Sequence, residues 1–275
     1  MNIQTAPRSG ETAKPVLLRE QDGAIAVLTL NRPRASNSLS EALLDALAQA
    51  LTAIATDKSV RAVVLGANGP VFCAGHDMKE LTAHRGEKDR GRAYFHHIMT
   101  KCSAMMQQIV NLPQPAIAAV QGVATAAGCQ LVASCDLAIA SEAAQFATPG
   151  VDIGLFCSTP MVALSRNVSS KHAMEMLLTG ELVAAEKARQ IGLVNRVTAA
   201  GKERDAALAL AREIAAKSSY VLKIGKQAFY KQAELGLAEA YAYASEVMTE
   251  NMMARDAEEG IGAFIEKRAP TWEDR

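Results

Sequence analysis

The sequence has no excess of either charge, because 29 lysine and arginine residues balance 29 aspartate and glutamate residues. A neutral chain gives no electrostatic argument for binding nucleic acid or an anionic membrane surface. It also has no apolar run that approaches the roughly 20 residues needed to span a bilayer. We therefore expect neither nucleic acid nor a membrane as a partner.

The five cysteines are scattered and odd in number, and no two have the Cys-x-x-Cys spacing of a metal or redox site. A chain of 275 residues can build a core without disulfides. The first fifteen residues have no apolar segment and only two basic residues, so they resemble neither a signal peptide nor a transit peptide. These features predict reduced thiols and a cytoplasmic protein.

Several catalytic and cofactor motifs are missing as well. The chain has no H-E-x-x-H, G-x-S-x-G, G-x-x-x-x-G-K-[ST] or G-x-G-x-x-G sequence. His96 and His97 are adjacent, which places them on different sides of a helix rather than on one metal ion. We expect no metal, no bound nucleotide and no nicotinamide cofactor.

Short apolar segments alternate with helical ones in the first two thirds of the chain. The expected strands are Ile25–Leu30, Val60–Leu65, Ala116–Val120 and Leu137–Ala140. Between them, apolar residues at three- and four-residue spacing after Ser40 or Ser38 predict an amphipathic helix, with Leu43, Leu44, Leu47, Leu51 and Ile54 on its buried face. This alternation predicts an α/β fold with a mostly parallel sheet and crossover helices.

The pattern changes towards the end of the chain. After residue 203 the strand pattern stops, and alanine-, leucine- and methionine-rich helical segments follow. We expect a core over residues 16–202, a helical region over 203–268 and a mobile tail over 1–15.

Two strands each end in a loop of small residues. Val63–Leu65 leads into the first loop at 72–75, and Ile117–Gly122 leads into the second at 124–128, where a helix begins. Small side chains let a ligand approach backbone N–H groups, and the first amides of a helix lack partners within it. Two such N–H groups on one oxygen would form an oxyanion hole. Close packing of strand and helix explains the same residues, so spacing alone leaves both interpretations open.

The order of the motifs resembles the crotonase (enoyl-CoA hydratase/isomerase) superfamily. Residues 72–81, FCAGHDMKEL, resemble that family's F-x-A-G-x-D-(L/I)-x-E-(L/M) loop, and residues 119–137 resemble its A-V-N-G-x-A-x-G-G-G-x-E-L-x-x-x-C-D segment. Further matches are Phe146 to Pro149, Gly180, Ala184–Ala188, Gly192–Val194 and Phe264–Arg268. The combination of ATAAGCQLVASCD with FATPGVDIGLFCSTP is similar, more narrowly, to the branch of enoyl-CoA hydratase domain-containing protein 3.

The resemblance implies a spiral of repeated ββα units and a C-terminal helical region that forms a homotrimer, often paired into a homohexamer. It also implies that an acyl-CoA thioester is the ligand, with coenzyme A as part of the substrate and no separate cofactor. By match, the oxyanion-hole donors are the backbone N–H groups of Cys73 and Ala127. The family usually has glycine at the second position, but a first-turn helical residue has negative φ, so alanine should fit. The other substrate-binding positions are Ala74, Gly75, His76, Asp77, Gly128 and Lys267.

The chain departs from the family where hydratases carry two glutamates that hold and activate water. Gln130 stands at the first position and Gly150 at the second. Glutamine can hydrogen-bond to water but cannot take its proton, and glycine has no side chain. Since general acid–base catalysis contributes about 10²–10⁴-fold per group, efficient hydration by that route is not expected.

Other residues offer alternative chemistry. Asp152 lies two positions after the missing second glutamate, and Ser158, preceded by Cys157, falls where some related isomerases and dehalogenases carry a carboxylate. A serine or cysteine near a thioester needs an activating base, which His76 and Asp77 could supply. Simpler interpretations are a turn cap for Asp152, a small core residue for Cys157 and loop bracing by Asp77.

Two main classes of function therefore remain, beside a purely structural role that would predict no affinity for acyl-CoA. The first is an enzyme of fatty acyl-CoA metabolism, nominally an enoyl-CoA hydratase or isomerase or a thioester hydrolase. The second is an acyl-CoA-binding protein with weak or no catalysis.

Overall fold

Most of the apolar strands form one six-stranded sheet in the computed structural model, which describes residues 14–275. Its spatial order is β1 (Leu17–Asp22), β2 (Ile25–Leu30), β3 (Ala62–Ala67), β5 (Ala116–Val120), β7 (Leu137–Ser141) and β10 (Arg196–Thr198). The β1–β2 pair is an antiparallel hairpin, and the other neighbours are parallel. Parallel strands need both faces of their sheet covered, and this explains their continuous apolar runs.

A second sheet is built from the short strands that directly follow β3, β5 and β7, together with one later strand, β9. Its order is β4 (Val71–Cys73), β6 (Val123–Thr125), β8 (Gln145–Ala147) and β9 (Val183–Ala184), with only the last pair antiparallel. Helices follow each strand pair: α2 (Met78–Ala83) and α3 (Arg92–Asn111), then α4 (Ala127–Ser134), then η3 (Pro149–Ile153), α5 (Pro160–Leu164) and α6 (Ser170–Thr179). The expected repetition of ββα units is confirmed.

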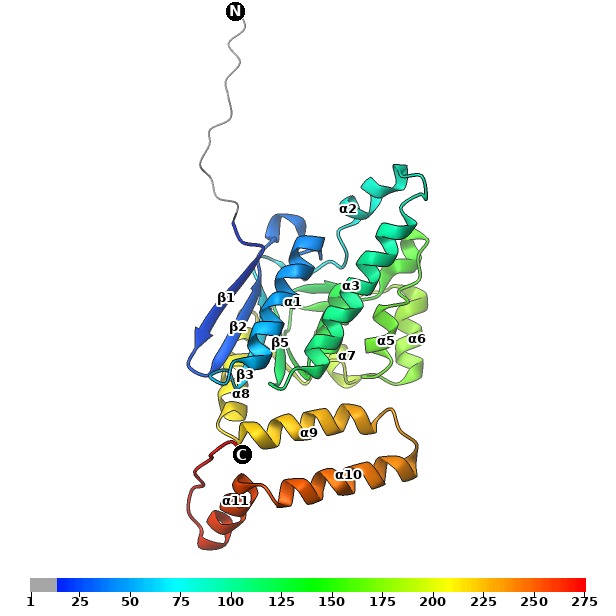
Figure 1. The fold of residues 1–275 in the computed structure, drawn as a ribbon. Helices are drawn as coiled ribbons and strands as arrows, with labels where there is room; N and C mark the ends of the chain where they lie inside the picture. Colours follow the sequence, from blue (N-terminus) through cyan, green and yellow to red (C-terminus); the bar gives the residue numbers. More distant parts are fainter. Residues whose placement is uncertain (1–13) are drawn as a thin grey trace, which may run out of the picture.

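Helix α1 (Glu41–Thr56) lies beside α3 (Figure 1). Ser40 caps α1 by accepting a hydrogen bond from Leu43 N at 3.2 Å. The predicted apolar face is fully buried in the main core, which also contains Phe72, Met105 and Phe146. The amphipathic pattern therefore identified which side of this helix meets the core.

Helix α8 (Glu203–Ala215) packs on the α/β core through a separate apolar cluster. Its Ala207, Leu210 and Ala211 contact alternate residues of the large sheet: Ile25, Val27, Ala62, Val64, Ile117, Ala119 and Ile139. Since alternate residues of a strand share one face, α8 covers the face opposite the main core. The part of the helical region that stands apart from both sheets therefore starts after α8.

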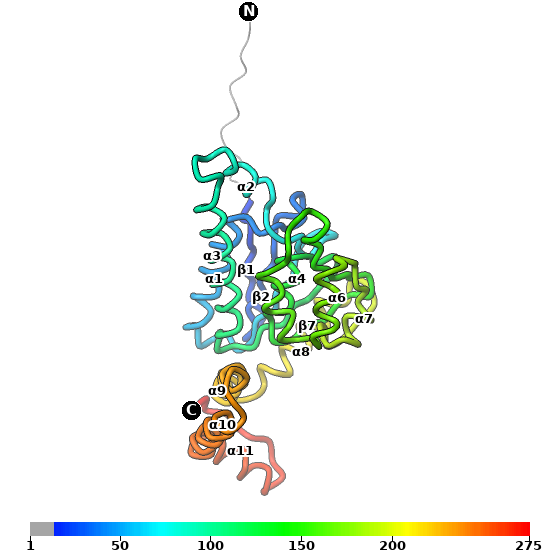
Figure 2. The backbone as a smooth tube through the Cα atoms, turned by 90° about the vertical axis from the view of Figure 1, so that its right-hand side faces the viewer, coloured from blue at the N-terminus to red at the C-terminus, as the bar shows by residue number. Residues whose placement is uncertain are grey.

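Helices α9 (Ser219–Gln232), α10 (Leu237–Met252) and α11 (Arg255–Glu266) lie below the sheets in Figures 1 and 2. Lys226 of α9 holds them to the core, because its Nζ donates to Asp136 Oδ2 at 2.7 Å and to the carbonyls of Ile109 and Gln114. Tyr230 donates to the other oxygen of Asp136 at 3.0 Å. Neither α9 nor α10 buries a residue completely within the single chain.

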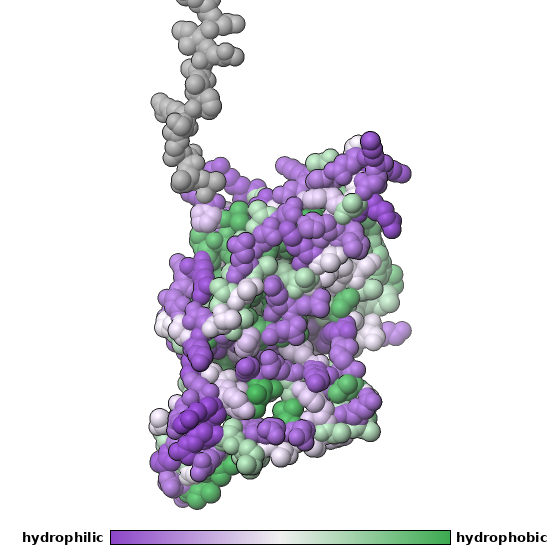
Figure 3. All heavy atoms as spheres, viewed as in Figure 1, coloured by the Kyte–Doolittle hydropathy of each residue, from purple (hydrophilic) through white to green (hydrophobic). Residues whose placement is uncertain are grey.

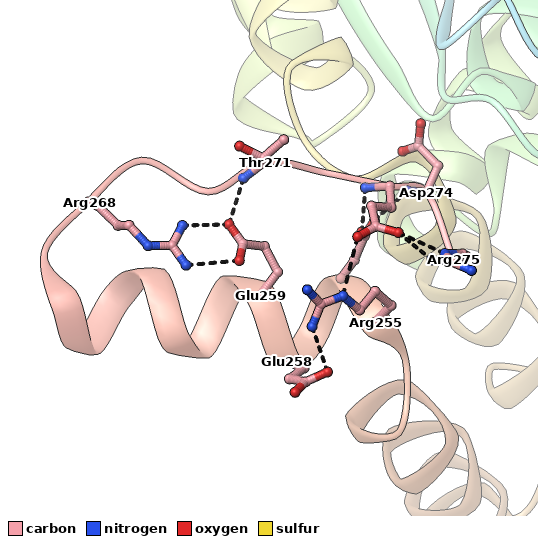
Figure 4. Close-up of polar contacts among 9 residues, drawn as sticks. Arg255, Glu258, Glu259, Arg268, Thr271, Asp274 and Arg275 are labelled. Atoms are coloured by element: carbon pink, nitrogen blue, oxygen red, sulfur yellow. Dashed lines mark hydrogen bonds and ion pairs between the residues drawn. The ribbon is translucent and has the colours of Figure 1, made fainter.

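The C-terminal residues fold back over α11, as Figure 4 shows. The Arg268 guanidinium donates to both carboxylate oxygens of Glu259 at 2.6 and 2.9 Å, and it lowers the pKa of Glu259 to about 2. Asp274 then pairs with Arg61, the residue directly before β3, at 2.6 Å. The chain end thereby ties α11 to the sheet domain.

Most of the expected elements are present with small shifts. The predicted strands Ile25–Leu30 and Ala116–Val120 match β2 and β5, whereas the strand expected at Val60–Leu65 is displaced to Ala62–Ala67. All five cysteines are free and buried. The expected mobile tail falls outside the described residues except for Lys14 and Pro15. Among residues 14–275, no helix is both long and apolar enough to cross a membrane.

Candidate functional site

The two small-residue loops meet at their glycines. A Cβ atom placed on Gly128 would lie 2.0 Å from the carbonyl oxygen of Cys73, and one on Gly122 would lie 1.9 Å from that of Pro70. A Cβ on Gly75 would lie 2.9 Å from the Ala126 methyl and 3.4 Å from Ala127 N. The first loop therefore rests backbone to backbone on the second, which no larger residue at these positions would allow.

The first loop is held in place by the segment that precedes α1. Ala74 N donates to Ser36 O at 3.1 Å, and Leu39 N donates to Gly75 O at 2.7 Å. The Asn37 amide is fully buried and donates to the carbonyls of Asn68 and Val71. These contacts fix the backbone around Cys73, at the end of β4. The sequence analysis did not single out Asn37. The available signal was its position as a polar residue in the turn-forming segment after Pro33.

Asp77 braces this loop. One of its oxygens caps α2 by accepting hydrogen bonds from Lys79 N at 3.1 Å and from Glu80 N. The other oxygen pairs with Arg32 at 2.9 Å. Burial raises the pKa of Asp77, but the hydrogen bond from Arg32 and those from the α2 amides outweigh burial and hold it below its usual value. Arg32, which sequence analysis did not single out, is thus the partner that keeps this carboxylate ionised.

The second loop places Ala127 as the first residue of α4. Its N–H group is one of the early amides that lack a partner within the helix, and its φ is not positive, as expected. The unusual conformation falls one residue earlier, because Ala126 has φ of 50° and ψ of −119°. This region favours glycine, and glycine is what the family motif has there. Strain of this kind costs of order 1–3 kcal/mol and is common at functional sites.

Gln130 and Gly150 are the residues that the motif resemblance aligns with the two hydratase glutamates. Gln130 is buried one turn into α4, and its Oε1 has no hydrogen-bond partner among the described residues. Gly150 is buried in η3, and a Cβ on it would lie 3.0 Å from both Cys157 Sγ and Leu155 O. The segment after η3 therefore occupies the space into which a side chain at residue 150 would point.

Asp152 in η3, and Cys157 and Ser158 in the segment after it, are not arranged as an activated nucleophile. Ser158 is exposed and its hydroxyl donates to Phe156 O at 3.3 Å. Burial raises the pKa of the Cys157 thiol, which disfavours the reactive thiolate. Asp152 is exposed, and its Oδ2 lies 3.0 Å from the Cβ position of Gly180.

His76 does not act with Asp77 as a pair. Both ring nitrogens of His76 are buried without a hydrogen-bond partner among residues 14–275, while both oxygens of Asp77 are engaged elsewhere. Burial lowers the pKa of His76, so the neutral imidazole is favoured. Thr148, directly before the Pro149–Gly150 segment, also has a buried hydroxyl without a partner. The base expected to activate Cys157 or Ser158 is therefore not assembled in this structure.

Lys267 lies far from these loops within one chain. It ends α11 with φ of 56°, and α11 lies at the opposite end of the molecule from α2 in both views (Figures 1 and 2). A single chain therefore does not bring Lys267 together with Cys73 and Ala127.

Comparison with known proteins gives a consistent result. The enoyl-CoA hydratase/isomerase family model matches residues 20–275. Mitochondrial enoyl-CoA hydratase domain-containing protein 3 is 45% identical in rat, over 98% of this chain and 88% of that protein, and 44% identical in human, over 97% and 86%.

Solved structures agree with this assignment. An enoyl-CoA hydratase from Mycobacterium smegmatis has a TM-score of 0.90 at 51% identity, covering 94% of this chain and 99% of that one. Human enoyl-CoA hydratase domain-containing protein 3 has a TM-score of 0.88 at 44% identity, covering 94% and 100%. The narrower resemblance to this branch is therefore confirmed.

The prediction of a cytoplasmic protein is corrected by the same relatives, since the names of those from rat, zebrafish, human and mouse describe mitochondrial proteins. An unremarkable composition at the first fifteen residues was too weak a signal to decide location. The ββα core, the two joined loops and the matches over nearly the whole length agree. The chain belongs to the enoyl-CoA hydratase/isomerase (crotonase) family.

Proposed function

We propose that this protein binds an acyl-CoA thioester and polarises its carbonyl group with the backbone N–H groups of Cys73 and Ala127, without rapidly adding water. The observation that carries the proposal is the backbone contact between the two loops, in which Gly128 lies against the Cys73 carbonyl. Two preorganised donors of this kind stabilise an enolate oxygen, and removal of one such donor costs about 3–4 kcal/mol in other enzymes.

The missing carboxylates argue against hydration. Gln130 is buried at one glutamate position, and the segment containing Cys157 fills the space beside Gly150 at the other. Unpartnered polar atoms of His76, Gln130 and Thr148 remain close to the loops in sequence. The Gln130 amide and the Thr148 hydroxyl can form hydrogen bonds but are not bases, so neither replaces a missing carboxylate.

A second candidate is a weak isomerase that uses Asp152. Its carboxylate is the only acidic side chain between Glu142 and Glu175, and Asp152 is exposed. It is therefore available to move a proton, whereas the Cys157 thiol is held protonated by burial. This candidate predicts turnover that disappears in Asp152→Asn while thioester binding remains.

The test combines calorimetry with a turnover assay. Crotonyl-CoA should bind in the micromolar range, and the absorbance of its conjugated thioester should stay nearly constant. Loss of that absorbance at rates typical of enzymes, about 1–10³ s⁻¹, with a hydroxyacyl product by mass spectrometry, would overturn the argument from Gln130 and Gly150. An absence of binding across a series of acyl-chain lengths would overturn the thioester site itself.

The C-terminal helices support a homotrimer or homohexamer. They expose large apolar side chains: Phe229, Leu237, Tyr241, Met248, Met252, Met253, Ile261, Phe264 and Ile265. Figure 3 shows such green side chains among purple ones over the lower part of the molecule. Exposed apolar surface of this extent is typical of protein interfaces, and a neighbouring subunit is the route by which Lys267 would reach an acyl-CoA phosphate. Light scattering at micromolar concentration should give a trimeric or hexameric mass, and a monomeric mass would refute the assembly.

A further inference from the structure

A small cavity lies on the α8 side of the large sheet, on the face opposite the main core. It has a volume of about 100 Å³ and is lined mainly by residues at the carboxyl ends of β2, β3 and β5, together with Glu203 and Arg204 at the start of α8. The volume of one water molecule in the liquid is about 30 Å³, so this cavity has room for roughly three. Nothing in the acyl-CoA proposal uses these residues.

The cavity arises from a change along the strands. On the face covered by α8, Val27, Val64 and Ala119 are apolar and contact the helix. Two residues further on, the same face carries Thr29, Gly66 and Gln121. A Cβ on Gly66 would meet only the carbonyl oxygen of Ala119, at 4.0 Å. Space opens at this row because a small residue and two polar ones replace the apolar residues.

Two side-chain oxygens in the cavity lining are buried and lack partners within residues 14–275. Glu203 is 7% exposed, makes no ion pair and has a buried Oε2 without a hydrogen bond. Gln121 Oε1 is likewise buried and unpartnered, and the Thr29 side chain lines the same cavity. The one cation in the lining, Arg204, donates to Glu20 at 2.7 Å.

We propose that this cavity is a binding site for one small monovalent cation, such as K⁺, Na⁺ or NH₄⁺, held by the oxygens of Glu203, Gln121 and Thr29. A buried carboxylate oxygen without a partner, such as Glu203 Oε2, is unfavourable, and a bound cation supplies that partner. The charge of Arg204 is balanced by Glu20, which leaves one negative charge for a single positive one. No cluster of three acidic, histidine or cysteine side chains exists in the described part of the chain to favour a divalent ion.

A cation bound on the α8 side of the sheet would also restrain the two small-residue loops. Gln121 Nε2 donates to Gly69 O at 2.9 Å, and the next residue, Gly122, lies against the Pro70 carbonyl. Gln121 therefore connects the strand that leads to Ala127 with the turn that leads to Cys73. A cation on its Oε1 restrains both.

The test compares melting temperatures of the full chain in KCl, NaCl and NH₄Cl with that in choline chloride at one ionic strength. At least one small cation should raise the melting temperature of the wild type by roughly 2–6 °C. Glu203→Gln keeps the shape of the side chain but removes its charge, so this difference should vanish. Glu213→Gln, on the exposed side of the same helix, is the matched control and should keep it.

Equal melting temperatures of the wild type in all four salts would overturn the proposal, as would a cation effect that survives in Glu203→Gln. A response to MgCl₂ or CaCl₂ alone would overturn the monovalent assignment. A second measurement does not depend on any variant. Crystals of the wild type grown in RbCl should show an anomalous peak between Glu203 and Gln121, and water alone in the cavity would refute the site.

Discussion

Replacing Gly128 with alanine tests the contact on which the proposed thioester site depends. The added Cβ would lie 2.0 Å from the Cys73 carbonyl oxygen and 2.8 Å from its carbon. Cβ contacts this short do not occur, so one of the two backbones must move. The Cys73 carbonyl has little freedom, because Ala74 N is bound to Ser36 O and Gly75 O accepts from Leu39 N.

The expected cost follows from this rigidity. Inserting a methyl group into a packed interior typically costs 1–3 kcal/mol and occasionally more. Because the clash is with backbone on both sides, Gly128→Ala should lie at the upper end, at about 3 kcal/mol. For a chain of this size that corresponds to a decrease in melting temperature of roughly 6–12 °C. Movement of the Cys73 peptide should also displace its N–H group and weaken thioester binding.

The assay is thermal unfolding followed by calorimetric titration with crotonyl-CoA below the melting temperature. Gly86→Ala is the matched control, since Gly86 is exposed, has no atom within 4 Å of a Cβ position and does not have positive φ. It should melt within about 1 °C of the wild type. If Gly128→Ala melted and bound like this control, the close contact between the loops, and with it the geometry of the oxyanion hole, would be wrong.

Three further predictions concern other parts of the molecule. Lys226→Met should destabilise the chain by about 3–5 kcal/mol in urea unfolding, because it leaves the Asp136 carboxylate, 16% exposed, without its cation. The control Lys223→Met, on the exposed face of α9, should have little effect. Equal losses of stability in the two variants would contradict the anchoring role of Lys226. The folded-state pKa of Asp77 lies below its usual value of 3.8, so its contribution is present above pH 3.8 and is lost as the pH falls towards the lower, folded-state pKa. Unfolding free energies of Asp77→Asn should therefore fall less steeply below pH 4 than those of the wild type, and parallel curves would argue against this linkage. Burial raises the pKa of Cys157, and it raises that of Cys73 to about 12. Native protein should therefore react slowly with iodoacetamide at pH 8, and all five thiols should react after denaturation. Rapid labelling of Cys157 in the native protein, detected by mass spectrometry, would restore it as a candidate nucleophile.

Much of the core was predictable because its signals are local. Leu43, Leu47 and Leu51 form one helical face at fixed spacing, and Ile25–Leu30 is a continuous apolar run, so each shows its structure without knowledge of the rest. The strands β4, β6 and β8 have only three residues each, too few for a period to emerge. They were implied by the family resemblance rather than by their own pattern.

Within the site, the sequence by itself indicated the family, and the identities of Gln130 and Gly150 exclude a carboxylate side chain at these two positions. Only the tertiary structure decided which distant residues lie next to one another. The partner of Asp77 is Arg32, 45 positions earlier in the chain, the space beside Gly150 is filled by Cys157, and Glu203 meets the end of β5 at a cavity. Each of these facts is a contact between side chains or backbones separated along the chain, and such contacts are fixed by the packing of sheets and helices, not by the local pattern of residues.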